Sequence, residues 1–137
     1  MKQWSMFIGR WQPWHKGHRW LIDQRLKEEK NVWVAIRDVK PNENQPWTSN
    51  EVLQNVTKEL LPLIEEGRVM ISIIPDIESV NFGRGVGYEI NEYQPPKDSG
   101  AMFISATKIR ESIKSGDNSW KTMVDTSLHK DIESYLK

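Results

Sequence analysis

Two histidines lie three residues apart in a segment rich in glycine and basic side chains. His15 and His18 close the stretch Gly9–His18, which reads Gly-Arg-Trp-Gln-Pro-Trp-His-Lys-Gly-His. At this spacing both imidazoles can face one ligand from the first turn of a helix. The free amides and positive end of that turn suit an anion, and Arg10 and Lys16 add further donors. The segment therefore predicts a phosphate-binding site.

Glycine and proline give this segment its expected shape. Gly9 allows a turn that most residues resist, Pro13 stiffens the loop, and Gly17 leaves room for a ligand against the backbone. The histidine pair could also supply two ligands of a metal site, which is the less favoured interpretation. The third histidine, His129, lies far along the chain, and the sequence shows no fourth ligand. No metal site is therefore expected.

Three tryptophans lie in or just after the segment. We expect Trp20 in the core. Trp11 and Trp14 are expected either to stack on a base or ring of a ligand or to pack the loop, and the sequence leaves both interpretations open.

A second group of polar residues follows a short apolar run near the end of the chain. Ser105 is a plausible cap for a helix, and Thr107 lies in its first turn. Both hydroxyls can bond orphan amides or phosphate oxygens, and Arg110 can present its guanidinium fork to a phosphate. Alone, this pattern is more typical of a capped surface helix than of a site.

Hydrophobic periodicity predicts strands and helices in alternation. The expected strands cover residues 4–8, 32–36, 69–74 and 102–104, with a further candidate over 88–93. The expected helices cover 16–30, 105–114 and 119–136, and one from a capping box at Thr48 and Glu51 to a stop at Gly67. This order predicts an α/β fold: a single Rossmann-like domain over residues 1–137, with a doubly wound parallel sheet and helices on both faces. Ligands of such sheets bind beyond the carboxyl ends of the strands.

Composition excludes several classes of protein. With 19 basic and 19 acidic residues the formal net charge is zero, which argues against a nucleic-acid partner. The absence of cysteine excludes disulfide scaffolds and thiol chemistry. The longest apolar stretch, residues 69–74, is too short to cross a membrane, and the first residues have no continuous apolar run of a signal peptide. We expect a cytoplasmic protein.

The segment Gly9–His18 resembles the G-x-F-x-P-x-H-x-G-H signature of the HxGH nucleotidylyltransferase superfamily, with Trp11 at the position of the usual Phe. Residues 104–110, Ile-Ser-Ala-Thr-Lys-Ile-Arg, resemble the I-S-x-T-x-I-R signature of the same superfamily. The resemblance implies transfer of a nucleoside monophosphate from a triphosphate to a phosphate acceptor, with release of pyrophosphate. It also implies that magnesium arrives with the triphosphate.

The resemblance assigns roles to residues of both segments. It implies that His15 and His18 contact the triphosphate, with His18 at the α-phosphate, and that Arg110 completes the catalytic set. The remaining nucleotide-binding residues that it implies come from both motifs: Gly9, Arg10, Trp11, Lys16, Gly17, Ser105 and Thr107.

Further segments resemble compact archaeal nicotinamide-mononucleotide adenylyltransferases. They are Asn44-x-Pro46-Trp47-Thr48, Pro75-Asp76-Ile77 and Gly87-Tyr88-Glu89-Ile90. This favours ATP and nicotinamide mononucleotide as substrates. Two alternatives stay open: a CTP-dependent cytidylyltransferase acting on a small alcohol phosphate, and a non-catalytic nucleotide sensor. The candidate acceptor-binding residues are Arg37, Asp38, Trp47 and Arg84. A homo-oligomer also stays open, with the final helix as the candidate surface.

Overall fold

The computed structural model describes residues 1–85, 87–95 and 104–135. Three parallel strands form one sheet in the order β1-β2-β3. They are β1 (Ser5–Gly9), β2 (Val32–Asp38) and β3 (Val69–Pro75). The register aligns Phe7 with Val34 and Val34 with Ile71. The predicted α/β class and parallel sheet are confirmed, with strand boundaries within two residues of those expected.

Two helices connect the strands: α1 (Lys16–Leu26) and α2 (Ser49–Glu65). Thr48 and Glu51 form the predicted capping box at the start of α2, and Gly67 ends that connection at a φ of 77°. The predicted helix over 16–30 is too long, because the chain leaves α1 after Leu26 and turns through Glu29 at a φ of 62°.

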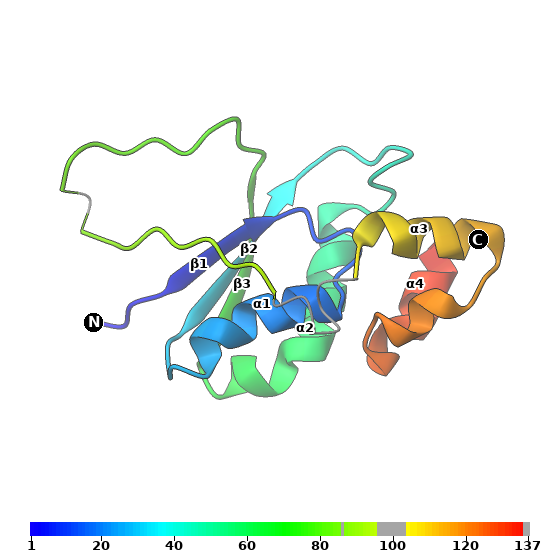
Figure 1. The fold of residues 1–137 in the computed structure, drawn as a ribbon, viewed down its shortest axis with the longest axis horizontal. Coiled ribbons are helices and arrows are strands. Elements are labelled where there is room, and N and C mark those ends of the chain that lie inside the picture. The colour runs from blue at the N-terminus through cyan, green and yellow to red at the C-terminus, as the bar shows by residue number, and fades with distance from the viewer. Residues whose placement is uncertain (86, 96–103, 136–137) are drawn as a thin grey trace.

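Both helices cover the same face of the sheet (Figure 1). The core on that face joins the alternate strand residues Val32, Val34 and Ile36 to apolar residues of α1 and α2. On the opposite face Met6 and Ile8 remain about 40% exposed. The expectation of helices on both faces is therefore wrong for the described residues. When each new parallel strand is added at the same edge of the sheet and every crossover is right-handed, all connecting helices lie on one face.

The C-terminal part lies beyond the carboxyl ends of the strands (Figure 1). It holds α3 (Ala106–Ser115), two short 3₁₀ helices (Ser119–Thr122 and Thr126–Leu128) and α4 (His129–Tyr135). The single helix predicted over 119–136 is wrong, because turns interrupt it. Leu128 and Ile132 are fully buried in the core. The apolar side of the final helix is thus used within the chain, which removes the reason for naming it as an oligomer surface.

The long connection after β3 contains no strand among its described residues. The candidate strand over 88–93 is therefore wrong, and the predicted strand 102–104 lies outside the described residues except for Ile104. Figure 1 shows this connection extending away from the sheet and returning across β1 toward α1. Within the described ranges, no helix combines the length and apolar composition needed to cross a membrane.

Candidate active site

The two histidines cap helix α1. The Nδ1 atom of His15, the N-cap residue, accepts hydrogen bonds from the backbone N–H groups of Gly17 at 3.0 Å and His18 at 3.3 Å. The Nδ1 atom of His18 accepts one in return from the backbone N–H of His15 at 3.2 Å. This is a capping box in which two imidazoles replace the usual hydroxyl and carboxylate.

The capping bonds fix the tautomer of both rings. A neutral imidazole whose Nδ1 accepts a hydrogen bond holds its proton on Nε2. Burial lowers the pKa of His15 to about 4. Burial also holds the pKa of His18 well below its usual range, and the neighbouring His15 lowers it further. Both rings are therefore neutral near pH 7, and each offers one Nε2–H donor.

The two rings are stacked, with centroids 3.6 Å apart and planes 19° from parallel. The two Nε2–H donors thus belong to two rings that lie directly against each other. Both residues line a pocket of about 360 Å³ beside the first turn of α1. Two neighbouring neutral donors at a pocket suit the oxygens of an anion, and no proton has to leave the rings for binding.

The free amides predicted for this helix turn are not free. The N–H of Lys16 donates to the Met123 carbonyl at 2.9 Å, and those of Gly17 and His18 are used by the His15 ring. The expectation of amide-based anion binding is wrong at these three groups. The imidazole Nε2–H groups and the positive helix end remain to attract an anion.

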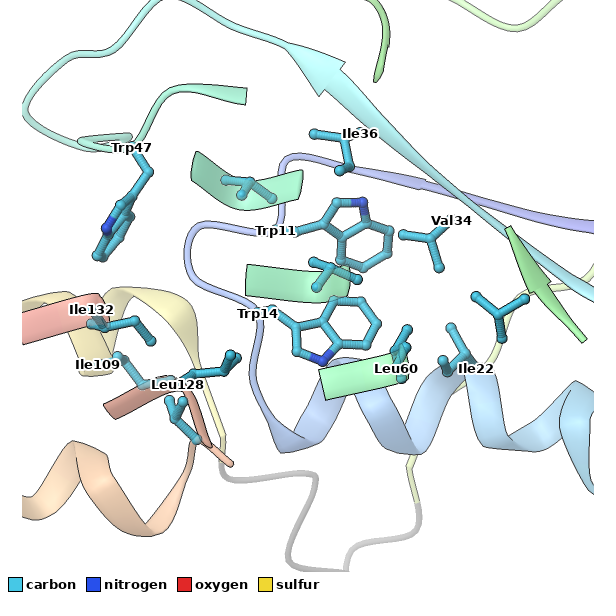
Figure 2. Packing of buried hydrophobic residues seen from close by; sticks show 14 of the residues in the cluster. Trp11, Trp14, Ile22, Val34, Ile36, Trp47, Leu60, Ile109, Leu128 and Ile132 are labelled. Carbon is cyan, nitrogen blue, oxygen red and sulfur yellow. The ribbon is translucent and has the colours of Figure 1, made fainter. Parts of the chain in front are cut away.

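Trp11 and Trp14 are buried and pack against the His18 ring. They are only 6% and 1% exposed and pack between the sheet and Leu60 (Figure 2). The His18 ring lies edge-on to Trp11, with centroids 4.8 Å apart, and 5.4 Å from Trp14. The buried Trp11 ring packs the loop, which confirms that interpretation, and the nucleotide contact implied for Trp11 stays a prediction. Trp20, expected in the core, is instead half-buried in the pocket wall.

Gly9 is needed because of the Trp11 ring. The left-handed conformation in this loop belongs to Trp11, at a φ of 54°, and not to Gly9. A Cβ atom on Gly9 would lie 2.8 Å from Cε2 of Trp11. The Trp11 ring is fixed by its own hydrogen bond from Nε1 to the Ala35 carbonyl at 3.1 Å. The expectation that Gly9 is needed for a turn is thus wrong, and its role is to leave room for the Trp11 ring.

Changing Gly9 to alanine is expected to lower the free energy of unfolding by about 1–3 kcal/mol, because the added methyl group overpacks against a fixed ring. Urea unfolding measures the loss. Gly83→Ala is the matched control, since a Cβ there would meet nothing within 4 Å. Equal losses of stability in the two variants would contradict the packing role of Gly9.

The second motif reaches the first through Arg110. Ser105 is the N-cap of α3 and accepts from the Lys108 N–H at 3.4 Å. Nη1 of Arg110 donates to the Gln12 carbonyl at 2.5 Å, and its Nη2 lies 3.4 Å from Thr107 Oγ1. Partial burial lowers the pKa of Arg110, whose guanidinium stays charged. The two motifs therefore meet at one edge of the molecule.

Two positioning residues were missed by sequence reasoning. The Gln12 amide donates to the Trp47 carbonyl at 2.9 Å and accepts from the Trp47 N–H at 3.1 Å. Glu59 of α2 accepts from Nε1 of Trp14 at 2.6 Å, and burial raises its pKa. Gln12 lies at a variable position of its motif and Glu59 in a different helix, so only the tertiary contacts reveal them.

The other predicted residues do not gather at the pocket. Trp47 is 1% exposed and belongs to the same core cluster as Ile109 and Ile132 (Figure 2), and its expected contact with an acceptor stays a prediction. Arg37 pairs with Asp76 at 2.6 Å. The remaining residues are exposed on loops, strand ends or the first helical turns: Arg10, Lys16, Asp38, Arg84 and Thr107. Arg84 belongs to the connection that extends away from the sheet (Figure 1).

No group of three or more His, Cys, Asp or Glu side chains is arranged to hold a metal ion within residues 1–85, 87–95 and 104–135. Asp38 of β2 accepts from the Ser49 hydroxyl at 2.7 Å, and Asp76 is paired with Arg37. The described residues therefore offer no dedicated cage for a divalent cation.

Acidification is expected to destabilise the protein between about pH 6.5 and pH 4. In that window the unfolded chain binds protons at His15 that the folded chain, with a pKa of about 4, does not bind. Above pH 6.5 the protonation of His15 does not lower the free energy of unfolding. At pH 5 His15 alone lowers it by about 2 kcal/mol. Urea unfolding at pH 7.5, 6 and 5 measures it.

His15→Asn is the control for this pH dependence. Asparagine keeps the N-cap bond to the helix amides and removes the titrating ring. The variant is expected to retain its stability at pH 7.5 and to lose less of it than the wild type at pH 5. An identical pH dependence in both proteins would contradict the neutral, buried state of His15.

Comparisons with known proteins support the resemblance. No protein-family model matches the chain. It is 26% identical to a nicotinamide-nucleotide adenylyltransferase of Methanococcus maripaludis over 94% of the chain and 88% of that relative. It is 28% identical to enzymes of the same name from Caldivirga maquilingensis, over 94% of the chain and 86% of the relative, and from Pyrobaculum neutrophilum, over 95% and 87%.

A solved structure supports the fold. It is a bifunctional NMN adenylyltransferase/ADP ribose pyrophosphatase from Francisella tularensis, matched with a TM-score of 0.62 at 21% identity over 90% of this chain. The chain spans 45% of the length of that structure. The predicted likeness to nucleotidylyltransferases is confirmed by these comparisons.

Proposed function

We propose that the protein transfers AMP from ATP to nicotinamide mononucleotide and releases pyrophosphate. The observation that carries this function is the stacked pair of neutral histidines, His15 and His18, at the pocket. Relatives matched over about nine-tenths of the chain are nicotinamide-nucleotide adenylyltransferases, which supports ATP and this acceptor. The comparisons do not favour the cytidylyltransferase or the sensor.

The chemistry needs no covalent intermediate. An oxygen of the acceptor phosphate forms a bond to the α-phosphorus of ATP, and the bond from that phosphorus to the bridging oxygen of the β-phosphate breaks. Pyrophosphate takes the electron pair, and the product is the dinucleotide. A phosphate monoester is largely ionised at neutral pH, so the attacking oxygen needs no general base. Neutral imidazole donors fit this reaction, because charge stabilisation and positioning remain the main tasks.

Each motif has a task in this proposal. The Nε2–H of His18 donates to the α-phosphate, where negative charge builds in the transition state, and His15 donates beside it. Ser105, Thr107 and Arg110 hold the β- and γ-phosphates. Arg110 also ties α3 to the loop below the histidines through the Gln12 carbonyl. The triphosphate thus spans the junction of the two motifs.

We further propose that Mg²⁺ is bound by the triphosphate, where it neutralises part of the phosphate charge. No residue of this chain is assigned to the ion. Arg10 and Lys16 remain the exposed cations closest in sequence to the histidines. Arg37 and Asp38 at the end of β2 remain candidates for the acceptor. That the whole chain acts as one domain also remains a prediction.

A substrate matrix tests the function. Pyrophosphate release is measured with Mg²⁺, ATP or CTP, and one of three acceptors: nicotinamide mononucleotide, glycerol phosphate or phosphopantetheine. We expect release with ATP and nicotinamide mononucleotide and little with the other pairs. Faster turnover of CTP with glycerol phosphate would support the cytidylyltransferase. Tight nucleotide binding without turnover in any pair would support the sensor.

A further inference from the structure

The pocket beside the histidines has a second wall that neither motif requires. Its polar end is formed by His15, Gly17 and His18. Its other lining residues come from three parts of the chain: Trp20, Leu21, Tyr93, Gln94, Pro95 and Ile104. A volume of about 360 Å³ lies in the range of small-ligand sites. The pocket therefore continues from the phosphate donors into an aromatic and aliphatic compartment.

The place of this compartment assigns it to the triphosphate substrate. Ile104 lines it and is followed directly by Ser105, the cap of α3. A triphosphate between the histidines and the start of α3 leaves its nucleoside next to Ile104 and Trp20. Arg37 and Asp38, the acceptor candidates from β2, do not line the pocket.

Trp20 has the properties of a stacking residue. It is half-buried on α1, while Trp11 and Trp14 are covered by the core. Those two rings also contact each other and His18 in edge-on or tilted arrangements, whereas Trp20 has no aromatic ring contact among the described residues. Tyr93, in the returning connection, is backed by Phe7 with ring centroids 6.4 Å apart and planes 21° from parallel. A half-buried ring, Trp20, and a ring backed by another aromatic side chain, Tyr93, thus line the compartment.

We propose that Trp20 stacks on the adenine base of ATP and that Tyr93 supports the base from the returning connection. The proposal rests on the proposed function for the identity of the nucleotide. Base–aromatic stacking makes a measurable contribution to affinity, and a residue that contacts only the base leaves the triphosphate contacts intact. Trp20 is then a determinant of ATP binding that the two sequence motifs do not contain.

The test separates the base from the phosphates. Dissociation constants of ATP and of inorganic tripolyphosphate, which has no base, are measured by calorimetry for the wild type, Trp20→Leu and Trp20→Phe. We expect Trp20→Leu to weaken ATP binding about 10-fold, Trp20→Phe to weaken it much less, and tripolyphosphate binding to be unchanged in both. Trp4→Leu, at a half-buried tryptophan that does not line the pocket, is the control.

Three results would overturn the proposal. ATP affinity could be unchanged in Trp20→Leu, or ATP and tripolyphosphate could weaken equally, which would indicate a structural role. A selective loss of nicotinamide mononucleotide binding would place the acceptor ring in the compartment instead. Because these are binding measurements, a wild type that binds ATP through Trp20 but makes no dinucleotide would refute the proposed function and leave this inference standing.

Discussion

Replacing His18 with alanine is expected to lower turnover by about 10²–10³-fold while ATP still binds, because a hydrogen-bond donor to the transition state is lost. The Nδ1 atom of His18 is committed to the helix cap, so Nε2–H is its single remaining donor. Steady-state pyrophosphate release gives kcat, and calorimetry gives the affinity for ATP.

The structural role of His18 has its own control. Glutamine at this position can keep the bond to the N-cap backbone N–H, as in an ordinary capping box, but lacks the imidazole. His18→Gln is expected to unfold at the same urea concentration as the wild type and to have low turnover, like His18→Ala. Wild-type turnover in either variant would rule out the mechanism proposed for His18.

Replacing Arg110 with alanine is expected to weaken ATP binding by about 10- to 100-fold, since hydrogen bonds to a charged group contribute about 1.5–3 kcal/mol. The variant loses the phosphate contact and the bond to the Gln12 carbonyl that joins the two motifs. We expect KM for ATP to rise and kcat to fall together. Initial rates over a range of ATP concentrations separate the two constants.

Arg110→Lys and Lys108→Ala complete the Arg110 experiment. Lysine keeps the charge but cannot make the two-point contact, so partial recovery is expected. Lys108 lies on the exposed side of the first turns of α3, and its removal is expected to leave KM for ATP near the wild-type value. If Lys108→Ala raised KM as much as Arg110→Ala does, general positive charge rather than a specific contact would be responsible.

The sequence predicted the elements whose signals are local. Alternating strands and helices follow from periodicity, and the Thr48–Glu51 capping box and the Gly67 stop follow from residue type. The meeting of the two motifs was also predictable, because both are predicted to follow strands, and the carboxyl ends of parallel strands meet at one edge of a sheet. The bond between Arg110 and the Gln12 carbonyl confirms that meeting.

Features that depend on tertiary packing were not predictable. The histidines were expected to leave the helix amides free, whereas they cap those amides themselves, and burial keeps both rings neutral. Two interpretations stayed open for Trp11 and Trp14, and the core position expected for Trp20 was wrong, because residue type does not reveal which face of a loop or helix meets the core. Trp11 and Trp14 fill the space between loop and sheet, and Trp20 lines the pocket. The C-terminal helix is interrupted by turns that local side-chain hydrogen bonds hold, and residue type predicts such turns poorly.

Label transfer tests the central claim most directly. The purified protein is incubated with Mg²⁺, nicotinamide mononucleotide and ATP labelled at the α-phosphate or, in a parallel reaction, at the γ-phosphate. The proposed function predicts that α-label appears in the dinucleotide and γ-label in pyrophosphate, in equal amounts. A protein that binds ATP but gives no α-labelled dinucleotide, or that releases labelled AMP or inorganic phosphate in its place, would contradict AMP transfer at this site.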